Sequence, residues 1–96
     1  MKEIRRTEAY IDWYDALANR QAKYRIFIRT KRLAEGNPGD HRFLGDMVSE
    51  MRIDCGPGYR VYYKETEAEL ILLLCGGDKK TQKQDIVKAK RLAKEI

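Results

Sequence analysis

The chain has 96 residues, which suffices for one small domain with a single core and excludes a second domain. Its 20 Lys and Arg residues outnumber its 15 Asp and Glu residues, and the formal net charge of +5 favours polyanionic partners such as RNA, DNA or an acidic protein segment. No apolar run approaches the roughly 20 residues that cross a bilayer. The first residues also lack the apolar stretch of a signal peptide, so we expect a cytoplasmic protein without membrane contact.

The N-terminal half predicts a strand followed by two helices. Residues 3–6 fit a short strand, and Thr7 can cap a first helix whose apolar residues recur at helical spacing. The apolar stripe continues over residues 18–35, and Gly36 ends this second helix before a turn. The aromatic residues at helical spacing are expected to pack in the core or between helices: Trp13, Tyr14, Tyr24 and Phe27. The basic residues of the second helix are left for solvent or a partner: Arg20, Lys23, Arg29, Lys31 and Arg32.

Residues 48–64 predict an antiparallel hairpin, because the apolar period changes to two on both sides of a Gly-rich turn. We expect Ile53 to pair with Tyr59 across this hairpin. Four side chains then gather on the face away from the core: Glu50, Arg52, Arg60 and Tyr62. Two arginines that face each other weaken a sheet, so the pair suggests a bound anion, and the planar fork of arginine suits phosphate oxygens. The alternative is a surface ion pair with the glutamate, usually worth under about 1 kcal/mol.

The C-terminal part predicts a strand, a glycine-rich turn and a closing helix. The apolar run at residues 70–75 is typical of a strand buried on both faces. The glycine-rich residues 75–78 resemble a place where backbone N–H groups meet phosphate. The alternative is a tight turn with Lys79 and Lys80 in solvent. Residues 81–84 fit a capping box for the last helix.

The cysteines and the histidine limit the chemistry further. Cys55 and Cys75 have neither Cys-x-x-Cys spacing nor a histidine cluster, so we expect ordinary small residues, no metal and no cofactor. His41 is the only histidine, and we expect it in a solvated loop. The elements in order are a strand, two helices, three antiparallel strands and a closing helix, which predicts one α+β domain over residues 1–96.

Four segments, in this order and spacing, resemble a known family. They are residues 35–40 (EGNPGD), 50–53 (EMRI), 56–63 (GPGYRVYY) and 73–82 (LLCGGDKKTQ). Together they resemble the HigB-like addiction-module killer branch of the RelE/ParE toxin superfamily. The resemblance implies a RelE-like, microbial RNase-like fold, in which a small antiparallel sheet packs on two N-terminal helices and a C-terminal helix follows.

The same resemblance implies the toxin of a type II toxin–antitoxin system, acting as a ribosome-dependent mRNA endonuclease that inhibits translation without a metal ion. The implied partners are mRNA on the ribosome and a cognate antitoxin, HigA-like with a helix-turn-helix, through which alone the toxin reaches operator DNA. Two alternatives stay open. The chain could be a ParE-like DNA gyrase inhibitor, or a catalytically silent component of an operon-regulating toxin–antitoxin complex.

The resemblance also implies roles for particular residues. Four are implied to be catalytic: Glu50, Arg52, Arg60 and Lys79. Three are implied to bind RNA: Lys80, Tyr62 and Gln82. The glutamate would be the base or orient the ribose, the two arginines would hold the phosphate, and the lysine would add charge. The tyrosine would stack on a base. The chain departs from better-studied nucleases of this family because no Tyr or His follows Tyr63, so the proton donor stays unassigned.

Overall fold

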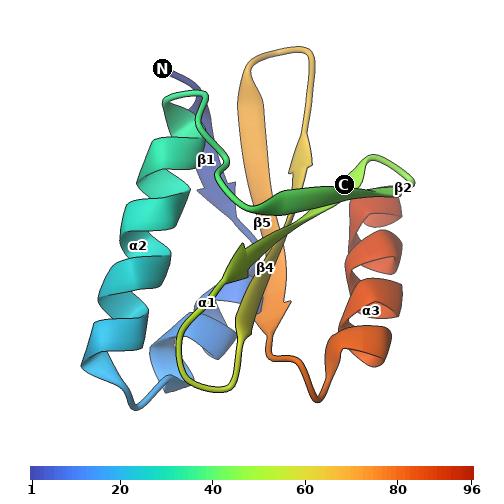
Figure 1. Ribbon diagram of the computed structural model, residues 1–96. Helices are drawn as coiled ribbons and strands as arrows, with labels where there is room; N and C mark the ends of the chain where they lie inside the picture. The colour runs from blue at the N-terminus through green and yellow to red at the C-terminus, as the bar shows by residue number, and fades with distance from the viewer.

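A computed structural model describes residues 1–96 as a five-stranded sheet with helices on both faces (Figure 1). The elements in chain order are β1 (Glu3–Arg6), α1 (Glu8–Ala16), α2 (Arg20–Ala34), β2 (His41–Gly45), β3 (Val48–Ile53), β4 (Tyr59–Glu65), β5 (Leu70–Gly77) and α3 (Gln82–Glu95). The strands follow the order β1-β5-β4-β3-β2 across the sheet. None of the three helices is both long and apolar enough to span a membrane.

The predicted α+β class is confirmed, with two differences in the sheet. β1 pairs in parallel with β5, so the sheet is mixed, while all other neighbours are antiparallel. Residues 41–45 form the edge strand β2, where the sequence predicted a loop. His41 is exposed as expected, but it lies in this strand. An edge strand with little buried surface needs no apolar alternation, so its sequence resembles that of a loop.

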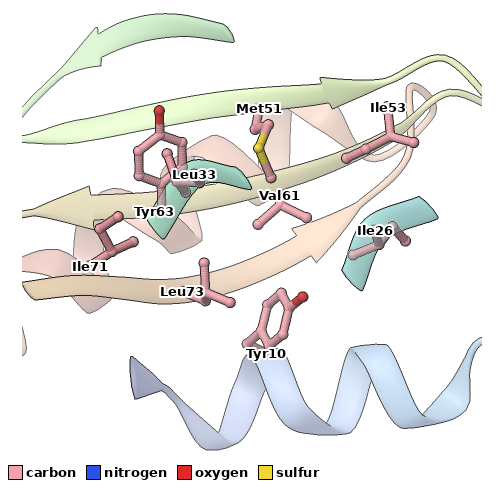
Figure 2. Close-up of a cluster of buried hydrophobic side chains, with 9 residues drawn as sticks. All are labelled: Tyr10, Ile26, Leu33, Met51, Ile53, Val61, Tyr63, Ile71 and Leu73. Carbon is pink, nitrogen blue, oxygen red and sulfur yellow. The ribbon is translucent and has the colours of Figure 1, made fainter. Parts of the chain in front are cut away.

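The larger core lies between the sheet and the two N-terminal helices (Figure 2). Its nine buried residues are Tyr10, Ile26, Leu33, Met51, Ile53, Val61, Tyr63, Ile71 and Leu73. Alternate residues of β3, β4 and β5 contribute to it, which explains the period of two in the hairpin. Each fully buried aliphatic side chain stabilises the fold by about 1.5–3 kcal/mol relative to exposure. This core therefore holds α1 and α2 against one face of the sheet.

A second core lies between α3 and the opposite face of the sheet. Its seven buried residues are Val48, Tyr62, Leu72, Leu74, Cys75, Ala89 and Ala93. The two alanines let the helix approach the sheet closely. At the C-terminal end of α3, the Lys64 Nζ group donates hydrogen bonds to the carbonyls of Ala93 (3.0 Å) and Ile96 (3.3 Å). These carbonyls would otherwise lack partners at the end of the helix. Residues of β5 enter both cores, so the predicted strand buried on both faces is confirmed.

The helix caps follow the sequence in part. Thr7 caps α1, because its hydroxyl oxygen accepts a hydrogen bond from the Tyr10 N–H at 3.1 Å. The predicted capping box of the last helix is wrong, because Thr81 makes no side-chain cap bond. Asp78 serves this end instead, and its carboxylate accepts hydrogen bonds from the N–H groups of Lys80 (2.9 Å) and Thr81 (3.2 Å). The Thr81 hydroxyl is then free to donate to Asp85.

The four helical aromatic residues divide into two groups. Trp13 and Tyr14 pack against the larger core, as expected. Tyr24 and Phe27 are 65% and 47% exposed, so of the two expected positions, in the core or between helices, the core is ruled out for them. Helical spacing predicts that residues share a face, but the sheet covers only the stripe of α2 that contains Ile26. The two exposed rings lie outside that stripe.

Candidate anion-binding site

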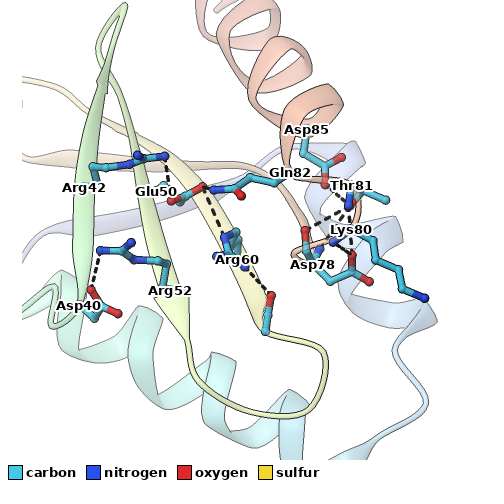
Figure 3. Close-up of polar contacts among 11 residues, drawn as sticks. Asp40, Arg42, Glu50, Arg52, Arg60, Asp78, Lys80, Thr81, Gln82 and Asp85 are labelled. Atoms are coloured by element: carbon cyan, nitrogen blue, oxygen red, sulfur yellow. Dashed lines mark hydrogen bonds and ion pairs between the residues drawn. The ribbon is translucent and has the colours of Figure 1, made fainter.

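Two rows of side chains cross the sheet on the face that carries α3 (Figure 3). One row is formed by Arg42, Glu50 and Tyr62, and the other by Arg52 and Arg60. The predicted hairpin register is confirmed, with Arg52 opposite Arg60 and Glu50 opposite Tyr62. Strand β2 adds Arg42 opposite Glu50, which the sequence analysis missed because it predicted a loop there. We call Arg42, Arg52 and Arg60 the arginine patch.

Glu50 is the buried centre of this site, with no exposed surface. Gln82 Nε2 donates a hydrogen bond to its Oε2 atom at 2.9 Å. Arg42 Nη2 lies 3.6 Å from Oε1, and Arg60 Nε lies 3.6 Å from Oε2. Distances of 3.6 Å exceed those of hydrogen bonds, so the two arginines act on the carboxylate as neighbouring charges. Side chains from β2, β4 and α3 therefore converge on one carboxylate of β3.

The expectation that all four hairpin side chains lie on a face away from the core is wrong for Glu50 and Tyr62. Glu50 and Tyr62 are both 0% exposed, because α3 covers this part of the sheet. The Tyr62 ring is therefore not available to stack on a base in this structure. Burial raises the pKa of its hydroxyl, and the nearby Glu50 and Asp85 carboxylates raise it further. Alternation in a strand distinguishes its two faces but does not tell whether a distant helix covers the second one.

The two opposed arginines turn to separate partners in this structure, and the expectation that they hold one phosphate stays a prediction. Arg52 Nη2 donates to Asp40 Oδ1 at 2.9 Å, whereas Arg60 Nη1 donates to the Gly58 carbonyl at 2.8 Å. Arg60 shares Glu50 with Arg42 instead. The side chains of Arg52 and Asp40 are 39% and 60% exposed. Such a pair contributes about 0–1 kcal/mol, so an anion can replace Asp40 at little cost.

Arg29 supports the site from α2, although the sequence left it for solvent or a partner. Its guanidinium is half-buried and donates hydrogen bonds to the carbonyls of Arg52 (2.6 Å), Pro38 (3.0 Å) and Asp40 (3.1 Å). Burial lowers the pKa of Arg29, while the charge of Asp40 acts in the opposite direction. The contacts tie the turn before β2 to the end of β3. They thereby hold Asp40 beside Arg52.

Gly76 and Gly77 lie at the end of strand β5, where the sequence predicted a turn, and they serve packing on both faces of the sheet. A Cβ atom on Gly76 would lie 2.3 Å from the ring of Trp13, and one on Gly77 would lie 1.8 Å from Asp85 Oδ2. Both glycines are thus explained without a phosphate, which favours the alternative of a plain tight turn. Lys79 and Lys80 are exposed after this turn, as that alternative expects. The Cβ atom of Lys79 lies near the hairpin turn that precedes Arg60.

Several buried polar atoms of the site have no hydrogen-bond partner within the chain. They are Glu50 Oε1, Arg52 Nε, Arg60 Nε and Tyr62 Oη. Buried polar atoms are normally paired, and here all the exceptions lie in the two rows described above.

Cys75 lies beside these rows with a buried thiol whose pKa is raised to about 12 by burial, so it is a poor nucleophile at neutral pH. Both cysteines are free, and no three His, Cys, Asp or Glu side chains are grouped as metal ligands would be.

Comparisons with known proteins place this site on a recognised fold. No family model matches the chain. An uncharacterized protein of Haemophilus influenzae is 48% identical over 94 residues, which cover 98% of this chain and 95% of that protein. A chain of the intact Escherichia coli RelBE toxin–antitoxin complex superposes with a TM-score of 0.69 and 12% identity, covering 81% of this chain and 96% of that chain. The isolated Escherichia coli RelE toxin gives a TM-score of 0.66 and 10% identity, covering 92% and 98%. At these identities the likeness to the solved structures shows a shared fold.

Proposed function

Because the chain belongs to one family with the Haemophilus influenzae protein and has the fold of the RelE toxin, we propose that it is the toxin of a type II toxin–antitoxin pair. The solved RelBE complex, in which that fold occurs together with an antitoxin, supports a cognate antitoxin as the partner. The four sequence segments quoted above favour the HigB-like branch. They imply a HigA-like antitoxin with a helix-turn-helix that carries any contact to operator DNA.

The activity we propose is ribosome-dependent cleavage of mRNA in the cytoplasm. In this reaction the ribose 2′-OH attacks the adjacent phosphorus and the bond to the next 5′ oxygen breaks. One proton leaves the 2′ oxygen and one is gained by the leaving oxygen, which yields a 2′,3′-cyclic phosphate and a 5′-OH. The chain contributes cationic groups that stabilise the negative charge developing on the phosphate, and the ribosome contributes the alignment of the RNA.

The arginine patch on a RelE-like sheet is the observation that carries this proposal. Arg60 is the most enclosed of its members, with a side chain that is 12% exposed, and its guanidinium is held between Glu50 and the Gly58 carbonyl. A fixed guanidinium suits a phosphate whose charge increases during the reaction. Arg52 can join Arg60 on the phosphate by leaving Asp40. Lys79 adds an exposed positive charge beside the hairpin turn that precedes Arg60. Lys80 and Gln82, from the segment that links β5 to α3 and the first residue of α3, are proposed to contact the RNA.

Primer extension on a defined transcript in a purified translation system tests the proposal. We expect the native chain to cut the transcript only when ribosomes are present. Arg60→Ala should reduce the cleavage rate about 10²-fold, the usual effect of removing one group that stabilises transition-state charge. Arg5→Ala is the matched control, since Arg5 is an exposed arginine of β1 at the opposite edge of the sheet. Intact transcripts alongside cleavage complexes of DNA gyrase would instead identify a ParE-like inhibitor. Intact transcripts without any growth phenotype would identify a silent component.

A further inference from the structure

The edge strand β2 brings into the site a guanidinium to which the proposed activity assigns no role of its own. Arg42 lies directly opposite Glu50 in the β2–β3 pairing, on the same sheet face as Arg52 and Arg60. Its side chain is 52% exposed, whereas that of Glu50 is fully buried. One side of the Arg42 guanidinium therefore faces a buried carboxylate and the other faces solvent. A guanidinium has five N–H donors, so most of those of Arg42 remain available to an incoming anion.

Glu50 is poorly placed to act as a base on a substrate. A general base must come within about 2.6–3.2 Å of the proton that it removes. Glu50 has no exposed surface, and groups from three other elements surround it: Arg42, Arg60 and Gln82. A ribose hydroxyl cannot reach the carboxylate without displacing one of them. The same enclosure is suited to a different task, which is to fix the positions of the two guanidinium groups.

We propose that Arg42 binds a phosphate of the RNA together with Arg60, and that Glu50 is the positioning residue that holds both guanidinium groups toward one site. The inference rests on the proposed function, because it takes RNA as the anion. It assigns Arg42 a role that the sequence analysis did not give it. It also replaces the base role of Glu50 with an indirect one. The converging pair is then Arg42 and Arg60, whose strands flank β3, rather than Arg52 and Arg60.

The affinity for a single-stranded oligoribonucleotide, measured by fluorescence anisotropy over a range of salt concentrations, tests the role of Arg42. Each phosphate contact adds about 0.7 to the slope of log affinity against log salt for a single strand. We expect Arg42→Ala to lower that slope by about this amount and to weaken binding about tenfold. Arg42→Lys keeps the charge but loses the planar fork, so it should keep the slope and recover part of the affinity. Arg5→Ala is again the matched control. An unchanged slope in Arg42→Ala would overturn the role of Arg42.

Glu50→Gln separates a positioning role from a purely electrostatic one. Removing a negative charge from an anion-binding site should tighten RNA binding if the carboxylate only repels the ligand. If Glu50 positions Arg42 and Arg60, the variant should instead bind RNA more weakly, by roughly threefold or more, because the two guanidinium groups lose their shared partner. Tighter binding would overturn the positioning role. If this variant does not fold, the two Arg42 variants still decide whether the patch extends to β2.

These binding measurements are independent of the cleavage assay. If the native chain binds RNA with an Arg42-dependent slope but cuts no transcript, the inference stands and the proposed nuclease activity fails. If the native chain cuts mRNA and Arg42→Ala changes neither the slope nor the cleavage rate, the nuclease activity stands and the inference fails. A native chain that does not bind the oligonucleotide even at low salt would overturn the inference, and the ribosome-dependent cleavage assay would still decide the nuclease activity.

Discussion

The substitution Gly76→Ala distinguishes a packing role of the glycine-rich turn from a phosphate-binding role. The added Cβ atom would lie 2.3 Å from two carbons of the Trp13 ring and 2.5 Å from a third. Non-bonded carbon atoms need a separation of about 3.5–4.0 Å, so the ring or the strand must move by more than 1 Å. Overpacking of this kind costs about 1–3 kcal/mol. For a domain of this size each kcal/mol lowers the melting temperature by about 4–8 °C.

Urea and thermal unfolding of Gly76→Ala give this cost directly, and a double-mutant cycle with Trp13→Leu shows its origin. The smaller leucine leaves room for the added methyl group, so Gly76→Ala should cost at least 1 kcal/mol less in the Trp13→Leu background. Equal costs in the two backgrounds would refute the packing explanation. A stable Gly76→Ala variant that fails to bind RNA would refute it as well, and would restore the turn as a phosphate site.

The remaining predictions concern buried polar and ionisable groups. Tyr62→Phe removes a buried hydroxyl without a hydrogen-bond partner, so it should stabilise the fold by about 1 kcal/mol in urea unfolding. Tyr14→Phe loses the 2.9 Å hydrogen bond to the Lys23 carbonyl and should destabilise the fold by a similar amount. Destabilisation in both variants would show that the Tyr62 hydroxyl has a hydrogen-bond partner. Burial raises the pKa of Tyr10 above its usual value of 10.0. The stability linked to the Tyr10 hydroxyl is therefore full below about pH 10 and is lost as the pH rises further, because the hydroxyl ionises first in the unfolded chain. Between pH 9 and 12 the urea midpoint should fall less steeply in Tyr10→Phe than in the native chain. An equal fall in the two proteins would contradict this. Burial raises the pKa of Cys75 to about 12, so this thiol should resist iodoacetamide at pH 8 while the half-buried Cys55 reacts. Peptide mass spectrometry measures the labelling of each cysteine. Equal labelling of Cys55 and Cys75 in the native protein would contradict the burial of Cys75.

Local rules explain why the hairpin could be predicted from the sequence. The period of two and the glycine-rich turn determine which residues face each other, so Arg52 opposite Arg60 follows from spacing alone. The strand at residues 70–75 was predictable for a similar reason, because only burial on both faces accounts for an unbroken apolar run. Both features depend on residues that are near neighbours in the chain or on the composition of one segment.

Long-range contacts explain what the sequence could not reveal. Glu50 is buried because α3 returns to the sheet 32 residues later and places Gln82 on its carboxylate. Nothing within the hairpin encodes that contact. Arg42 was missed because an edge strand lacks a buried face and so lacks a pattern. Arg29 was assigned to solvent or a partner because a basic residue in a helix gives no sign that carbonyls of a distant turn will meet it.

Nuclear magnetic resonance of the side-chain Nε–H groups of arginine shows directly whether the arginine patch binds RNA. The titrant is a short RNA whose 2′ oxygens are methylated, so that it binds without being cut. The account predicts that the signals of Arg42, Arg52 and Arg60 shift together on addition of this RNA, while that of Arg5 does not. Shifts confined to the exposed arginines of α2, with the arginine patch unaffected, would contradict it.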